Sequence, residues 1–227
     1  AAPDYNKVRD EANFNGHTLG DYLTNPLLCT HSFVPAIVPA NAVICTSGDI
    51  DLSNKVIGTS SVIITDGKIS SSGGANLTNV SLISKTSSIS MSGGNTLTNV
   101  RFFSESGITL SGGTAVAGKS TVASGGNITL SGGTKPVEAI GSDGKTKVGI
   151  AIIGAGKIVL SGGSVYYGSI WGGSSVTLSG GTSVFGGIAT TGDISLTGGA
   201  FVDTNVSVNN DELPKTDSKG LTVLSRR

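Results

Sequence analysis

The sequence GITLSGGTAV occupies residues 107–116, and close copies of it recur along the chain. Residues 126–134 read GNITLSGGT, residues 156–165 read GKIVLSGGSV, and residues 192–202 read GDISLTGGAFV. In each copy, Ile or Val and then Leu alternate with polar residues, which is typical of a half-buried strand. The Gly-Gly pair that follows permits a tight corner. Each copy therefore predicts a strand and a corner of one repeating unit.

The repeat has a short and regular period. Aligned on the [Ser/Thr]-Gly-Gly triplet, the copies are anchored at Ser72, Ser92, Ser111, Ser131, Ser161, Ser179 and Thr197. The steps between these anchors are 20, 19, 20, 30, 18 and 18 residues, and residues 48–58 form a degenerate earlier copy. Such units are too short for a propeller blade, which needs about 40 residues.

These features predict an all-β fold: a single-stranded parallel β-solenoid, or β-helix, of about eight coils of 18–20 residues. Equivalent strands would stack about 4.8 Å apart. The segments GGANLTNV (73–80) and GGNTLTNV (93–100) indicate the same stacking, because they would place Asn79 over Asn99 as an amide ladder. The 30-residue step predicts a polar loop at 135–147 that leaves the coil.

Two parts of the chain lie outside the repeat, which itself spans residues 47–208. Residues 1–46 predict an N-terminal cap with a short helix that begins after Asp4 and ends at Gly16. Residues 209–227 predict a C-terminal cap strand that folds back over the last coil, or an exchange strand that pairs with a neighbouring molecule. Exchange would place the assembly contact at Leu221, Val223 and Leu224.

Cys29 and Cys45 are the only cysteines and lie 16 residues apart. The chain opens with AAPDYN and has no initiator Met, which indicates a mature terminus after signal removal or a trimmed chain. Disulfides persist in exported proteins. We therefore predict a Cys29–Cys45 disulfide and an extracellular or cell-surface location. The alternative is a pair of reduced, buried thiols.

Composition and motifs exclude several classes of function. The 15 basic and 15 acidic residues balance, so the chain lacks the dense basic surface that nucleic acids require, and we expect no nucleic-acid partner. No window holds the roughly 20 apolar residues of a membrane span. Phosphate-loop, metal-ligand and nucleophile motifs are absent from the sequence. We expect no enzymatic activity, no cofactor and no metal site.

Aromatic residues gather in two successive units, although only 5% of the chain is aromatic. They are Tyr166, Tyr167, Trp171 and Phe185. Adjacent Tyr166 and Tyr167 must point to opposite faces of a strand, so at least one is expected to face solvent. Exposed rings stack on sugars or anchor protein partners. The alternative is that the rings fill a wider part of the core.

The units SIWGGSSVTLSGGTSVFGGIATTGDISLTGGAFV (169–202) resemble the β-solenoid repeats of bacterial surface and pilus-associated proteins. They are similar to PilX-like and ComZ-like minor pilins and, more distantly, to polymer-forming bactofilins. The resemblance covers residues 48 to about 208. The chain departs from pilins in lacking a hydrophobic N-terminal helix, unless that helix precedes this sequence, and from bactofilins in its cysteines.

The resemblance implies an extracellular, non-enzymatic role in a surface assembly. We expect an exported structural subunit of a bacterial fibre, pilus or surface appendage. It would associate with itself or with other fibre subunits through its capped ends. The alternative is a surface adhesin or pilus-tip receptor that binds glycan or protein through the aromatic residues.

Overall fold

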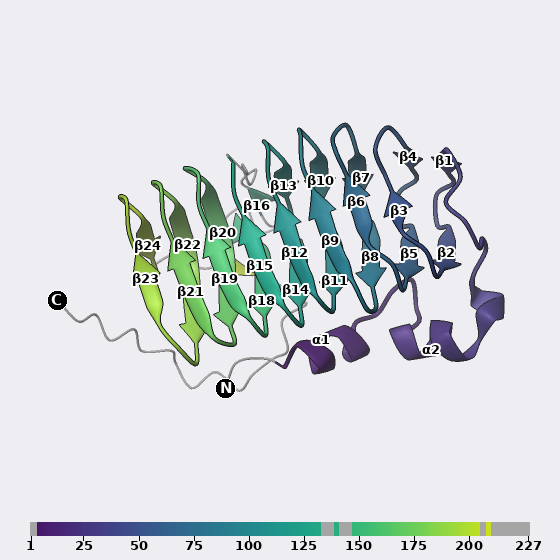
Figure 1. Cartoon of the computed structure of the whole chain (residues 1–227), viewed down its shortest axis with the longest axis horizontal. Coiled ribbons are helices and arrows are strands. Elements are labelled where there is room, and N and C mark those ends of the chain that lie inside the picture. Colours follow the sequence, from purple (N-terminus) through teal and green to yellow (C-terminus); the bar gives the residue numbers. More distant parts are fainter. Residues whose placement is uncertain (1–3, 133–138, 141–146, 205–207, 210–227) are drawn as a thin grey trace.

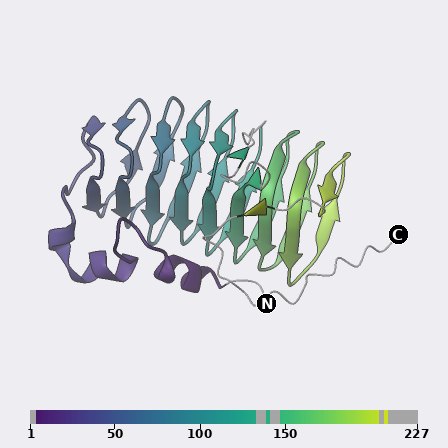
Figure 2. The same ribbon diagram turned by 180° about the vertical axis from the view of Figure 1, so that it is seen from behind.

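Parallel strands stack into a β-solenoid, as the sequence repeat predicts (Figure 1). The structure, a computed structural model, describes residues 4–132, 139–140, 147–204 and 208–209. Each copy of the repeat makes one coil, and one strand from every coil joins an eight-stranded sheet. The coils follow one another along a common axis, so the solenoid forms a rod with three sheets along its sides (Figures 1 and 2).

The sheets are named here by their strand numbers. The eight-stranded sheet contains β3 (Ile50–Asp51), β6 (Ile69–Ser71), β9 (Ser88–Met91), β12 (Gly107–Leu110), β15 (Asn127–Leu130), β19 (Lys157–Leu160), β21 (Ser175–Leu178) and β23 (Ile194–Leu196). The nine-stranded sheet contains β2 (Val43–Thr46), β5 (Val62–Thr65), β8 (Ser81–Ser84), β11 (Arg101–Ser104), β14 (Thr121–Ser124), β18 (Ile150–Gly154), β20 (Val165–Gly172), β22 (Ser183–Thr190) and β24 (Phe201–Asp203). The five-stranded sheet contains β1 (Ile37–Val38), β4 (Val56–Ile57), β7 (Asn76–Thr78), β10 (Thr96–Thr98) and β13 (Ala115–Ala117). A small additional sheet contains β16 (Ala139–Ile140), β17 (Lys147–Val148) and β25 (Val208–Asn209).

Equivalent residues of successive coils lie over one another. In the eight-stranded sheet, Ile108 is in register with Ile89 before it and with Ile128 after it. These side chains are at most 1% exposed and belong to one core cluster that runs through the solenoid. The outward residues between the core positions are mostly hydroxylic, so this side of the rod is polar: Ser70, Ser90, Thr109, Thr129, Thr177 and Ser195.

The change from 20-residue to 18-residue coils alters the path of the chain. In the longer coil that begins with β12, two strands, β13 and β14, follow the Gly-Gly corner. In the shorter coils, one eight-residue strand takes their place, either β20 or β22. These strands bend at Gly168 and Gly186, which have φ values of 157° and 143°. A side chain at either glycine would overlap the backbone of the preceding coil.

The predicted asparagine ladder is present at a corner of the solenoid. Asn99 Nδ2 donates a hydrogen bond to Asn79 Oδ1 at 3.0 Å. The backbone N–H of Lys119 in turn donates to Asn99 Oδ1 at 3.0 Å, which continues the ladder into the next coil. Asn79 and Asn99 have φ values of 55° and 52°, a left-handed conformation that asparagine tolerates better than most residues. The ladder therefore stabilises a corner that few other side chains suit.

Two short α-helices and a 3₁₀-helix precede the solenoid. Helix α1 (Tyr5–Glu11) begins as predicted, because the side chain of Asp4 accepts a hydrogen bond from the Asn6 amide. It ends earlier than predicted, since Gly16 lies beyond it in a separate turn. Helix α2 (Leu19–Thr24) begins with a capping box, and η1 (Pro26–Leu28) follows it.

Both α-helices lie along the outer face of the nine-stranded sheet (Figures 1 and 2). Tyr5 and Tyr22 are buried there together with Phe103, and the ring of Phe14 meets Phe103 edge-on with centroids 5.4 Å apart. Burial raises the pKa of Tyr5 from its ordinary value of 10.0 to about 12. Helices α1 and α2 of the predicted cap therefore cover a side of the rod. The later part of the predicted cap lies at the first end of the rod, because β1 and β2 are the first strands of their sheets.

The predicted disulfide joins Cys29 and Cys45, with their Cα atoms 5.7 Å apart. It links the segment after η1 to strand β2. Next to it, the backbone N–H of Thr30 donates to the Val43 carbonyl at 2.7 Å, and His31 forms a parallel bridge with Ile44. This short segment therefore adds to the first edge of the nine-stranded sheet.

Candidate functional site

Of the aromatic residues singled out in the sequence, Tyr166, Tyr167 and Trp171 lie on strand β20 and Phe185 lies on β22. Burial alternates strictly along β20, as expected for a pleated ribbon. Tyr166 points inward and is 0% exposed, so it belongs to the core and not to the surface. Tyr167 and Trp171 point outward and are partly buried. The adjacent tyrosines thus point to opposite faces, as their positions in the sequence predict.

The outward rings of three adjacent strands contact one another. Tyr167 and Phe185 are in register on β20 and β22, and their rings stack with centroids 5.0 Å apart and an interplanar angle of 18°. Phe185 also meets Phe201 of β24 edge-on, at 5.7 Å. Trp171 lies on the same face of β20 as Tyr167. We call these four residues the aromatic strip.

The aromatic strip continues the surface that the helices cover. Trp171 is in register with Ile153, which is 1% exposed in the cluster beneath α1 and α2. The same outward column runs back through Phe103 and Ile83. Strands β17 and β25 also contact β20. The strip therefore continues, beyond the helices, the apolar face of the nine-stranded sheet that α1 and α2 cover.

The last coil leaves core positions uncovered. Ile194 and Leu196 of β23 are in register with Val176 and Leu178 of β21 and continue their inward columns. Val176 and Leu178 are 0% exposed, but Ile194 is 48% and Leu196 is 47% exposed. Among the described strands, none pairs with the outer edge of β23 or β24. Within the described ranges, this end of the rod therefore presents apolar side chains beside a sheet edge that no further strand covers.

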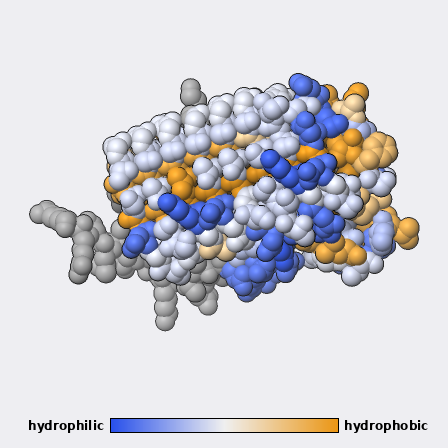
Figure 3. Space-filling view, viewed as in Figure 1, coloured by the Kyte–Doolittle hydropathy of each residue, from blue (hydrophilic) through white to orange (hydrophobic). Residues whose placement is uncertain are grey.

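The exposed large hydrophobic side chains of the described residues belong either to the N-terminal segment and the first two coils or to the last described coil. Ile37 and Val56 are in register on the outward face of the five-stranded sheet. The N-terminal patch consists of Leu23, Leu27, Phe33, Ile37 and Val56. The C-terminal patch consists of Ile194, Leu196 and Phe201. Figure 3 shows hydrophobic side chains gathered at the end where β1 and β4 lie. The coils between the patches contribute none of these exposed side chains in the described ranges. Sequence reasoning missed both patches, because each member looks like an ordinary strand or loop residue.

Other residues singled out in the sequence lie mostly outside the part of the chain that the structure describes. The assembly residues Leu221, Val223 and Leu224, and most of the 135–147 loop, lie outside the described residues. In the part of the chain that is described, no three His, Cys, Asp or Glu side chains are placed to hold a metal ion. No helix within the same ranges has both the length and the apolar character needed to cross a membrane.

Comparison with protein-family models, with curated proteins and with solved structures gives no match to this chain.

Proposed function

We propose that the protein is an exported structural subunit of a bacterial extracellular fibre or surface appendage, in which rods join end to end. The observation that carries this proposal is that the last described coil exposes Ile194 and Leu196, whose counterparts one coil earlier are fully buried. Contiguous exposed apolar surface is a common mark of protein interfaces. The Cys29–Cys45 disulfide agrees with an extracellular location.

The geometry of the last coil supports a partner that stacks along the axis. A further layer would bury Ile194 and Leu196 as completely as Val176 and Leu178 are buried one coil earlier. Burial of apolar surface contributes about 25 cal/mol per Å². The outer edges of β23 and β24, which pair with no further strand of the described residues, would also gain strand partners. Both the burial of apolar surface and the new strand pairing favour contact with a neighbouring subunit over exposure to solvent.

The two patches differ in sequence and geometry, so contact between them joins unlike surfaces. Such head-to-tail contacts generate open filaments when the rotation between subunits does not close into a ring. The hydroxylic flank of the eight-stranded sheet would stay in solvent. Association through that face is therefore less favourable than association through the uncovered core positions of the last described coil.

Substitution of Leu196 by lysine tests the C-terminal patch. We predict that Leu196→Lys weakens self-association by about a hundredfold, because burying an ammonium group without a partner costs several kcal/mol. The matched control is Ser195→Lys, which places the same charge on the adjacent, outward position of β23. Sedimentation velocity across a concentration series measures both variants. Equal association of wild type and Leu196→Lys, or no association of wild type, would contradict the proposal.

A second candidate function is adhesion through the aromatic strip, and the in-register stack of Tyr167 on Phe185 favours it. Parallel rings on adjacent strands offer a flat platform for a sugar ring or an apolar side chain of a protein. In this case Trp171→Ala should weaken binding of the partner at least about tenfold, as expected for an aromatic hot spot. Thr177→Ala on the eight-stranded sheet is the control. Glycan and surface-protein screens in which both variants bind like wild type would rule out this function.

A further inference from the structure

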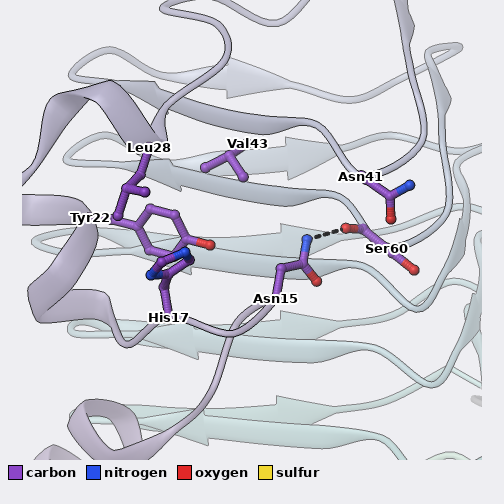
Figure 4. A pocket seen from close by; sticks show the side chains of 7 residues that line it. All are labelled: Asn15, His17, Tyr22, Leu28, Asn41, Val43 and Ser60. Carbon is purple, nitrogen blue, oxygen red and sulfur yellow. Dashed lines mark hydrogen bonds between the residues drawn. The ribbon is translucent and has the colours of Figure 1, made fainter.

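A cleft lies between the N-terminal segment and the first corners of the solenoid, and its lining shares no residue with either patch or with the aromatic strip (Figure 4). Its volume is about 470 Å³, which is within the range of small-ligand sites. Tyr22 and Leu28 of the N-terminal segment and Val43 of β2 form its apolar wall. The ring of His17 lies beside Tyr22, and the polar rim consists of Asn15, Asn41 and Ser60.

The cleft occurs where the asparagine ladder is interrupted. Asn41, Ser60, Asn79 and Asn99 precede equivalent strand residues in four successive coils, and their φ values are 60°, 60°, 55° and 52°. In the later coils, Asn99 donates to Asn79, and Asn79 donates to Thr59 Oγ1 at 3.3 Å. Ser60 is too short to continue this chain of amides. Because the side chain of Ser60 is short, space remains beside Asn41.

The interruption leaves hydrogen-bonding groups at the rim. Among the described residues, the side-chain amide of Asn41 makes no hydrogen bond. Asn15 Nδ2 donates to the backbone carbonyl of Ser60 at 2.6 Å, and the carbonyl oxygen of the Asn15 amide remains at the rim (Figure 4). Donors and acceptors thus lie on one side of the cleft.

The opposite side is aromatic and apolar. The rings of His17 and Tyr22 meet edge-on with centroids 5.6 Å apart, and Leu28 and Val43 lie beside them (Figure 4). The hydroxyl of Tyr22 is already used, because it donates to the Phe14 carbonyl at 2.7 Å. None of the described residues that line the cleft is Asp, Glu, Lys or Arg. The site therefore suits an uncharged ligand with one polar edge and one apolar face.

We propose that this cleft binds a neutral pyranose sugar. Ring hydroxyls would exchange hydrogen bonds with the amides of Asn41 and Asn15 and with the Ser60 hydroxyl. The C–H face of the sugar would pack on the wall formed by His17, Leu28 and Val43. The proposal does not rest on end-to-end assembly, since no residue of either patch lines the cleft.

Heteronuclear NMR tests the proposal by following the side-chain amide signals of Asn15 and Asn41. The probes are the methyl glycosides of glucose, galactose, mannose and N-acetylglucosamine, each added to the full chain. We expect at least one of them to shift both signals, with a Kd of about 1 mM or below. If none of the four shifts either signal at several times that concentration, the proposal is overturned.

Two variants separate binding from folding. Ser60→Asn should fill the cleft and complete the ladder, so binding should fall at least about tenfold while the midpoint of unfolding stays the same or rises. Asn41→Gly removes the free amide but keeps a residue that adopts left-handed φ, and it should weaken binding similarly. The control is Asn54→Gly, which changes another left-handed asparagine, with φ 58°, outside the cleft. Wild-type binding by both Ser60→Asn and Asn41→Gly would overturn the proposal.

Discussion

Substitution of Gly186 by alanine is expected to lower the free energy of unfolding by about 4 kcal/mol, a loss that few single substitutions produce. Gly186 is the bend of β22, where φ is 143°. An added Cβ would overlap the carbonyl oxygen of Gly168, which belongs to the backbone of the preceding coil. Backbone cannot rotate away as a flexible side chain would, so the two coils must move apart. Equilibrium unfolding in urea measures the loss.

The neighbouring residue provides a matched control. A Cβ added at Gly187 would meet no atom within 4 Å, and its φ is not positive. Gly187→Ala should therefore remain within about 1 kcal/mol of wild type, and the lower chain entropy of its unfolded state favours stabilisation. Similar losses for the two variants would show that the strand does not bend at Gly186 as described.

Substitution of Phe103 by alanine is expected to cost about 3–5 kcal/mol, the usual range for removing a buried phenylalanine. Phe103 is 1% exposed and forms the edge-on contact with Phe14 at 5.4 Å. It points away from the solenoid core, so its loss should act first on the layer formed by α1 and α2. Hydrogen exchange should show those helices losing protection, while β9 and β12 of the eight-stranded sheet keep theirs.

Phe33→Ala is the control for this prediction, because its side chain is 63% exposed. It should change the free energy of unfolding by no more than about 0.5 kcal/mol. Equal loss of protection in the helices and in β12 after Phe103→Ala would contradict the description of the helices and the solenoid core as two separate hydrophobic clusters. In that case the helices and the coils would unfold as one unit.

The solenoid itself could be predicted because its determinants are local and repeated. Alternation such as Ile108 and Leu110 fixes the inward face of a strand, and the Gly-Gly pair fixes a corner. Because the unit repeats, equivalent residues of successive coils stack on one another. The same repetition predicts that Asn79 lies over Asn99, which the hydrogen bond between their side chains confirms. The Cys29–Cys45 bond was predicted from cysteine count and the start of the chain.

The position of the N-terminal helices was not predicted, although the sequence carries a signal for it. The nine-stranded sheet contains pairs of adjacent large apolar residues, such as Ile63 with Ile64 and Phe102 with Phe103. Neighbours in a strand point to opposite faces, so both faces of this sheet must be covered. Ile63 and Phe102 pack in the solenoid core, whereas Ile64 and Phe103 pack against the helices on the outer face of the sheet.

The proposed sugar cleft could not be predicted from sequence. Asn15, Asn41 and Ser60 each look like ordinary turn residues, and only the packing of the N-terminal segment on the sheet brings them together. The end patches could not be predicted for a related reason. Ile194 and Leu196 obey the same alternation as the buried residues of earlier coils, and nothing in that pattern indicates which coil is the last described one.

Negative-stain electron microscopy of the full chain across a concentration series tests end-to-end assembly most directly. The account predicts unbranched filaments that lengthen with concentration, in which rods of about 40 Å, from eight rises of about 4.8 Å, lie along the filament axis. Dispersed single rods at every concentration would contradict it.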